Sequence, residues 1–280
     1  MTVASEVSTE SVTLTPQASV TAGLDQASGL QRTGHLVDAA AALEKVLVTA
    51  RATPYEIEFQ TRIRLGMTLS DVYLALGKNQ EARGMLAAEV AFAEKISQIM
   101  QATGTPPQKR AAMSGYLQIR DRATQIALLG QTAPEIEIKT WIVGGPVRLE
   151  DLRGRVVLLE FWATWCKPCQ EMFPKLKQLH ERASTRGLEI VAITRHYMAY
   201  GGTAESKQEE LQLMDTTVTN HGVSFAVGVA EDESLQKTYG ANGLPTAILI
   251  DRRGVVRYAG PGGEDPGFEV TLWQCLEESA

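Results

Sequence analysis

Two cysteines three residues apart, Cys166 and Cys169, are the side chains of this sequence best suited to chemistry. They follow an apolar run, 156–162, that is typical of a buried strand, and precede a segment, 170–179, with the pattern of a helix. A thiolate is the nucleophile in disulfide exchange, and the free N–H groups and dipole of a helix N-terminus favour a thiolate. The spacing therefore predicts dithiol–disulfide chemistry, with Cys166 at the helix start and Cys169 one turn later.

The residues between the cysteines suit the same chemistry. Lys167 places a cation beside the first thiol, and Pro168 falls in the first helical turn, where a missing N–H is tolerated. We expect Cys166 to attack a substrate disulfide and Cys169 to resolve the mixed disulfide. The alternative for the pair is half of a structural metal site. That site requires two more ligands, and the sequence offers no second pair, so no metal or other cofactor is expected.

Strands and helices alternate around the cysteine motif. Two short strands are expected at 135–139 and 146–149, and a pair joined by a tight turn at 247–251 and 255–259. The other expected elements are strands at 156–161, 188–194 and 225–229, a helix that follows the cysteine motif and runs to about residue 183, and helices at 204–221 and 265–278. This order predicts a mixed sheet covered by helices on both faces.

The first half of the chain has an almost purely helical pattern from about residue 30 to residue 129. Gly34, Ala39 and Leu43 recur as Gly77, Ala82 and Leu86, with an offset longer than the usual tetratricopeptide period of about 34 residues. The short connections predict antiparallel helices that resemble tetratricopeptide hairpins, and a plain hairpin array is the alternative. The expected helices are 37–50, 55–76, 81–101 and 108–129.

Motifs throughout the second half resemble those of thioredoxin-fold redoxins of the TlpA/ResA-like group. The matching segments are 130–134, 149–154, 161–169 with Pro174, and 243–251. The resemblance implies a thioredoxin-like domain that exchanges disulfides with protein thiol or disulfide substrates and is served by an upstream redox partner. We therefore expect a tail or arm at 1–27, an all-α tetratricopeptide-like domain at 28–129, and an α/β thioredoxin-like domain at 130–280.

The resemblance also implies roles for residues outside the motif. Pro245 would be a cis proline packed against the dithiol, and Leu244 before it would offer backbone to an extended substrate. Glu160 would be a buried acid that helps to deprotonate Cys169, with a pKa raised by burial. The alternatives are an ordinary turn proline and a strand-end acid paired with a cation. The family commonly has a glutamate three residues after the second cysteine, where this chain has Met172.

Further candidates surround the motif. Trp165, Lys167 and Pro168 are expected to contact substrate, whereas Trp162 is expected to pack in the core. The segment 194–203, with two tyrosines and a methionine, is expected to help select the substrate, the alternative being a packed loop without substrate contact. Within it, His196 is interpreted as a solvated histidine. Cys275, between two leucines of the last helix, is expected to be a buried, inert thiol.

Composition narrows the remaining possibilities. The net charge of −6 argues against nucleic acid as a partner, and no apolar run reaches the roughly 18 residues of a membrane helix. The N-terminus has neither the basic nor the apolar part of a signal peptide. The location is therefore either cytoplasmic or, by the resemblance, extracytoplasmic with a leader that this sequence lacks.

The leading functional prediction is a thiol–disulfide oxidoreductase, and the motif does not set the direction of electron flow. One alternative is an adaptor whose helical domain recruits a protein partner to the redoxin module. Another is a peroxiredoxin-like peroxidase, although Leu159 stands where the proline of the peroxidatic motif would be expected.

Overall fold

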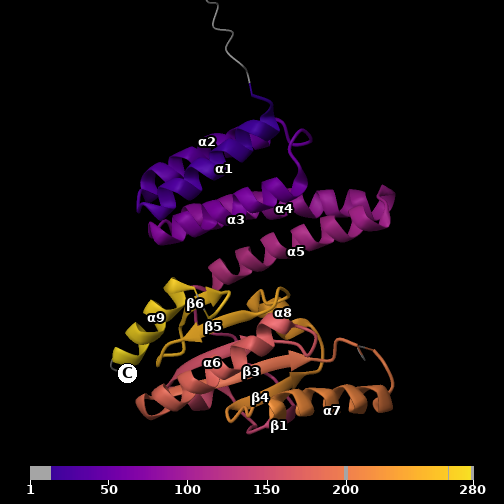
Figure 1. The fold of residues 1–280 in the computed structure, drawn as a ribbon, viewed down its shortest axis with the longest axis vertical. Coiled ribbons are helices and arrows are strands. Elements are labelled where there is room, and N and C mark those ends of the chain that lie inside the picture. Colours follow the sequence, from indigo (N-terminus) through magenta and orange to yellow (C-terminus); the bar gives the residue numbers. More distant parts are fainter. Residues whose placement is uncertain (1–13, 199–200, 264, 279–280) are drawn as a thin grey trace, which may run out of the picture. The chain divides into compact units, whose positions relative to one another are not determined.

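The computed structural model describes residues 14–198, 201–263 and 265–278 and divides into two compact units, 1–116 and 117–280 (Figure 1). The boundary falls inside helix α5 (Pro106–Leu128) and not at residue 129, where the sequence pattern changes. The last part of that helix, from Leu117, therefore belongs to the same compact unit as the cysteine motif.

The first unit consists of two helical hairpins that use the same turn. Gly34 and Gly77 each follow a helix with positive φ, 78° and 71°, a conformation that glycine adopts without a Cβ clash. In each turn the residue after the glycine donates its N–H to the carbonyl five residues earlier. His35 donates to Leu30 and Lys78 donates to Tyr73. The internal repeat of the sequence therefore marks two equivalent hairpins. Their helices are α1 (Pro16–Arg32), α2 (Leu36–Ala52), α3 (Phe59–Ala75) and α4 (Asn79–Thr103).

Helix α1 corrects the expected tail at 1–27, because it begins at Pro16. Thr15 caps it by accepting the N–H of Ala18, and Pro16 occupies the first helical turn. Val20 and Leu24 are buried at helical spacing, so this segment forms part of the packed unit. Residues 1–13 lie outside the described part of the chain.

The second unit contains a six-stranded mixed sheet with the strand order β1-β4-β3-β2-β5-β6. Strands β2, β3 and β4 are parallel, and β1, β5 and β6 are antiparallel to their neighbours, which confirms the expected mixed sheet. The strands are β1 (Thr140–Val143), β2 (Val156–Phe161), β3 (Leu188–Arg195), β4 (Ala226–Ala230), β5 (Thr246–Ile250) and β6 (Val256–Gly260).

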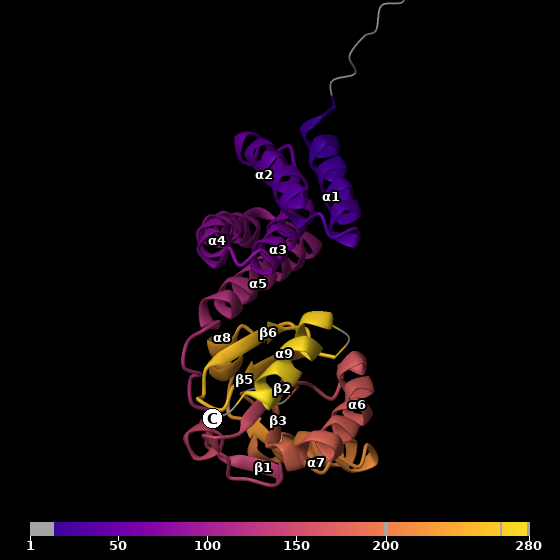
Figure 2. The ribbon, with the colours of Figure 1, turned by 90° about the vertical axis from the view of Figure 1, so that its left-hand side faces the viewer.

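Alternating residues of the central strands supply two separate cores. Leu158 and Trp162 face helices α6, α7 and α9, whereas Leu159 and Phe161 face helix α8. Figure 2 shows α6 and α7 on one side of the sheet and α8 on the other. The helices are α6 (Lys167–Ala183), α7 (Ala204–Asn220), α8 (Ser234–Tyr239) and α9 (Pro266–Glu277), with short 3₁₀ turns η1 (Leu149–Leu152) and η2 (Ser184–Arg186).

The prediction of two strands at 135–139 and 146–149 is wrong, because the structure has a single strand, β1, between these two segments. Ile136 and Ile138 bury their side chains in the α8-side core, but their segment joins no ladder. Instead, the Glu135 carboxylate accepts the N–H groups of Leu149 and Glu150 at 2.7 and 3.1 Å. A side chain thus holds these two segments together where backbone pairing was expected.

Candidate active site

The cysteine pair forms a disulfide at the N-terminus of α6. Cys166 is the residue that caps the helix, and its Sγ accepts the backbone N–H of Cys169 at 3.3 Å. Both side chains are buried, with 4% of Cys166 and 1% of Cys169 exposed. The same N–H and the helix N-terminus would favour a thiolate on Cys166 after reduction, which suits this sulfur to nucleophilic attack.

Aromatic side chains border the disulfide. Trp165 is 59% exposed and meets the ring of Tyr197 edge to face, with the centroids 5.4 Å apart. The guanidinium of Arg195 lies 4.1 Å from the centroid of the same tyrosine ring. Met198, also exposed, comes next in the chain. Trp165 and Met198 thus present apolar surface, as a substrate-contact role for Trp165 requires.

Glu210 of α7 holds the loop that carries these residues. One carboxylate oxygen, Oε1, accepts the backbone N–H groups of Tyr197 and Met198 at 2.9 and 3.0 Å. The other, Oε2, lies 3.2 Å from Nδ1 of His196. His196 is therefore a partly buried partner of a carboxylate and not the solvated residue expected. The sequence carried no local signal for Glu210, and Ala199 and Tyr200 lie outside the described residues.

The side chains after Cys166 point in different directions. Lys167 and Glu171 are exposed and form an ion pair of 3.8 Å across one helical turn. Met172 packs against the core that contains Cys166 and Cys169, called here the disulfide-side core. It also lies close to Gly263, where an added Cβ would be 2.6 Å from the Met172 Sδ. Glu171 thus faces solvent, and the apolar Met172 occupies the position where the resemblance implied a glutamate.

Glu160 is a buried acid on the same face of β2 as the disulfide-side core. Only 1% of it is exposed, and neither carboxylate oxygen has a hydrogen-bond partner among the described residues. Its neighbours across the sheet are Ala192 and Ala247, which leave room for the carboxyl group. Burial raises the pKa of Glu160 to about 8. The side chain can therefore take up or release a proton near neutral pH.

Leu244 and Pro245 enter strand β5 beside the cysteines. The Leu244–Pro245 peptide bond is cis, and Leu244 packs against the core cluster that contains Cys166 and Cys169. Thr246, the first residue of β5, pairs with Phe161, the last residue of β2. The loop before β5 and the turn that leads to Cys166 therefore lie at the same end of the sheet.

Trp162 and Cys275, both predicted to lie in the core, are buried. Trp162 is fully buried and packs edge to face on Phe173, with the centroids 5.0 Å apart. The Cys275 thiol lies in the core, and burial raises its pKa to about 11. A thiol with so high a pKa is almost entirely protonated near neutral pH, which suits a packing role.

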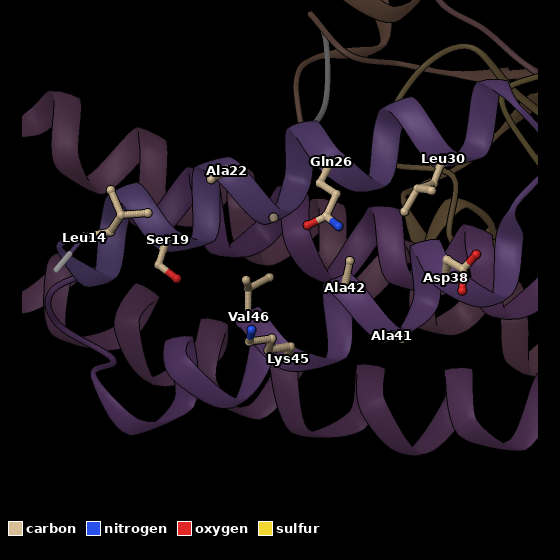
Figure 3. Close-up of a pocket in the computed structure, with 11 residues that line it drawn as sticks. Leu14, Ser19, Ala22, Gln26, Leu30, Asp38, Ala41, Ala42, Lys45 and Val46 are labelled. Carbon is tan, nitrogen blue, oxygen red and sulfur yellow. The ribbon is translucent and has the colours of Figure 1, made fainter. Parts of the chain in front are cut away.

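The first unit has an open groove of about 620 Å³ between α1 and α2 (Figure 3). Small and aliphatic side chains such as Ala22 and Val46 line it, together with Asp38 and Lys45, and none of its lining residues is aromatic. The groove therefore lacks the aromatic lining that would favour a partner-binding role for the helical unit.

Across residues 14–198, 201–263 and 265–278 there is no group of three or more His, Cys, Asp or Glu side chains suited to hold a metal ion. No helix in this described part has the length and apolar character that a membrane span needs.

Comparison with known proteins relates the second unit to thiol–disulfide chemistry. The model of the AhpC/TSA family matches residues 129–259. The thiol-disulfide oxidoreductase ResA of Geobacillus thermodenitrificans is 30% identical over 142 residues, 51% of this chain and 74% of the relative. ResA of Bacillus thuringiensis is 31% identical over 128 residues, which cover 46% of this chain and 66% of the relative.

Among solved structures, a thiol:disulfide interchange protein of the thioredoxin family from Chlorobium tepidum is similar with a TM-score of 0.42 and 24% identity. The similarity covers 52% of this chain and 95% of that one.

Proposed function

Because the chain belongs to the thioredoxin-fold AhpC/TSA family, with ResA-type thiol–disulfide oxidoreductases among its relatives, we propose that it exchanges disulfides with protein substrates. The observation that carries the proposal is the Cys166–Cys169 disulfide, with Cys166 capping α6. This position favours a thiolate on one defined sulfur.

In the reduced protein, the Cys166 thiolate attacks one sulfur of a substrate disulfide, and the other substrate sulfur leaves as a thiolate. A mixed disulfide now joins Cys166 to the substrate. The Cys169 thiolate then attacks Cys166 Sγ, and the second substrate sulfur leaves. Two electrons pass to the substrate, and the Cys166–Cys169 disulfide forms. The reverse sequence oxidises a substrate dithiol, and an upstream redox partner restores the starting form.

The second step needs a proton acceptor for the Cys169 thiol, and Glu160 is the proposed one. It is the buried carboxyl on the disulfide side of β2, and its raised pKa of about 8 suits proton transfer near neutral pH. The apolar Met172 occupies the position where TlpA/ResA-like redoxins commonly have a glutamate, so Glu160 acts without that second carboxylate.

The substrate surface is assigned to Trp165, Lys167 and Pro168 beside the disulfide, and to Leu244 and Pro245 facing it. The exposed Trp165 and the loop of Tyr197 and Met198 favour an apolar side chain next to the substrate cysteine. Replacing the 194–203 segment by a short Gly-Ser turn tests the loop, because unchanged turnover with the same protein substrate would exclude its role in selection.

Trapping of the mixed disulfide tests the order of the two cysteines. The Cys169→Ser variant should hold a substrate on Cys166, since the resolving thiol is missing, and mass spectrometry identifies the linked peptide. The Cys166→Ser variant should trap none. A substrate trapped on Cys169 alone would overturn the assignment. Consumption of hydrogen peroxide, measured in parallel, tests the peroxidase alternative.

A further inference from the structure

Asp121, in the part of α5 that belongs to the second unit, faces the segment that leads into β5. Its Oδ2 accepts the backbone N–H groups of Asn242 and Gly243 at 2.9 and 3.2 Å. Its Oδ1 accepts the Asn242 side-chain amide at 2.9 Å and lies 3.5 Å from Nη2 of Arg120. Only 6% of Asp121 is exposed, so both oxygens of a buried carboxylate are committed to this segment.

The helix backbone itself lies against the same segment. Gly240, at the end of α8, has a φ of 63°, and a Cβ there would lie 2.4 Å from the backbone oxygen of Asp121. One turn further along α5, Gln125 donates its side-chain amide to the Gly240 carbonyl at 2.7 Å. The contact between α5 and residues 240–243 is thus close-packed as well as hydrogen-bonded.

Gly243 depends on hydrogen bonds for its position because no atom lies close to the side where a Cβ would be. It is exposed, and an added Cβ would meet no atom within 4 Å. Glycine can sample many backbone conformations, and its ordering carries a large entropy cost. The hydrogen bond from its N–H to Asp121 therefore restricts the backbone immediately before Leu244.

The restricted segment leads directly to Leu244. Leu244 packs against the cluster that contains Cys166 and Cys169, and the Thr246 hydroxyl donates to the Gly243 carbonyl at 2.6 Å. Residues 242 and 243 are therefore held from the α5 side by Asp121, and the Gly243 carbonyl is held from the β5 side by Thr246.

We propose that Asp121 is a positioning residue for protein substrates, which fixes the backbone of Asn242 and Gly243 so that the loop at Leu244 can receive an extended substrate chain beside Cys166. The inference rests on the proposed function and deepens it. It adds a residue of the helix before the thioredoxin-like domain to the machinery that selects peptide over small disulfide substrates.

The test compares two disulfides with the same leaving group on the reduced full-length protein. One probe is 5,5′-dithiobis(2-nitrobenzoate), which has no peptide backbone. The other is a short extended peptide whose single cysteine is joined to 5-thio-2-nitrobenzoate. Release of the coloured thiolate gives the rate with either probe. For Asp121→Ala we expect the half-saturating peptide concentration to rise at least about fivefold, because a small misplacement of a substrate-holding group is costly. The rate with the small probe and the redox potential of the cysteine pair should not change.

Glu135→Gln provides a matched control. Glu135 also accepts three backbone N–H groups, from Ile136, Leu149 and Glu150. However, it holds η1, which precedes the start of β2, whereas the cysteines follow the other end of that strand. This variant should lose stability and keep the wild-type response to both probes. Asp121→Asn, which retains one acceptor oxygen, should fall between wild type and Asp121→Ala, and it replaces that variant if alanine prevents folding.

The outcomes separate the two proposals. If wild-type protein releases no thiolate from the peptide probe, the proposed function fails. If wild type reacts with the peptide probe and both Asp121 variants have the same half-saturating peptide concentration as wild type, the positioning role is overturned while the proposed function stands. A parallel loss with both probes would also overturn it, because Asp121 would then act on the cysteine pair or on the fold.

Discussion

Two carboxylates of the second unit show how environment decides the role of a residue. Glu160 is buried without a hydrogen-bond partner among the described residues, and burial raises its pKa to about 8. For Glu135, burial also works against ionisation, but hydrogen bonds from the backbone N–H groups of Leu149, Ile136 and Glu150 outweigh it, and the pKa is lowered. The sequence identified the first residue through its place before the cysteines and gave no signal for the second.

Replacing Glu160 by Gln should stabilise the oxidised protein as the pH rises. Below pH 4.5 the carboxyl is neutral in both the folded and unfolded states, so the substitution changes little. Above this pH the unfolded state loses the proton first, and wild type loses stability until the pH passes the folded pKa of about 8. Urea unfolding at several pH values should show that the free energy of unfolding of the variant exceeds that of wild type by an amount that grows over this window to the order of a few kcal/mol. A constant difference would show that Glu160 is not the titrating group.

Replacing Glu135 by Gln should have the opposite pH dependence. Its lowered pKa means that the charged form stabilises the fold above the unfolded value of 4.5, and this stabilisation is lost as the pH falls through the folded pKa. The variant should therefore be destabilised by about 1 kcal/mol at neutral pH, as for loss of a charged hydrogen bond at a partly exposed site, and approach wild type in acid. Urea unfolding at the same pH values measures this loss of stability. A loss that persists in acid would indicate a packing defect and not the loss of a charged group.

At the scale of elements, the helices and loops around the disulfide are joined by side chains that bond to the backbone of another element. Glu210 of α7 binds the loop after β3, and Asp121 of α5 binds the segment before β5. The sequence predicted the helix at 204–221 and the strands on either side of it. It did not indicate which carboxylate faces which loop, because that depends on how the folded elements pack against one another.

Helix α5 lies so close to the segment after α8 that Gly240 has no room for a side chain. Gly240 and Gly130 both have positive φ, 63° and 78°, but only at Gly240 would a Cβ meet backbone, 2.4 Å from the Asp121 oxygen. Gly130→Ala should cost about 1–2 kcal/mol from the left-handed conformation alone. Gly240→Ala should cost clearly more, because helix and segment must separate. Thermal unfolding of the two variants tests this, and equal shifts in Tm would contradict the close approach.

For the whole molecule, the structure places the division between the two compact units inside a helix. Residues 117–128 of α5 belong with the thioredoxin-like unit, although their sequence pattern continues the helical half. Ile126 is buried there, and Asp121 and Gln125 hydrogen-bond to residues 240–243. A fragment cut where the sequence pattern changes would therefore expose a surface of the second unit.

Two truncated chains test this boundary. A chain that starts at residue 117 keeps the Asp121 and Gln125 hydrogen bonds, and a chain that starts at residue 130 loses them together with the burial of Ile126. We expect the shorter chain to melt at least about 5–10 °C lower, given a shift of roughly 2–4 °C per kcal/mol for a domain of this size. Circular dichroism during heating gives both Tm values. Equal values would place the boundary at residue 130.

The sequence by itself predicted the dithiol chemistry, the mixed sheet and most of its helices and strands. A Cys-x-x-Cys motif between an apolar strand and a helix needs only local geometry, because the helix start that favours a thiolate lies within a few residues of the cysteines. Turn glycines such as Gly34 and Gly77 are local in the same way.

The tertiary structure alone decided which distant side chains support the site. Asp121 binds a backbone N–H that lies 121 residues further along the chain, and Glu210 of α7 binds backbone N–H groups of the loop between β3 and α7, 12 and 13 residues earlier. No periodicity or spacing encodes such a pair, because the contact exists only after the sheet, α5 and α7 have packed. For the same reason, helix α5, which the sequence pattern assigned to the helical half, belongs in part to the second unit.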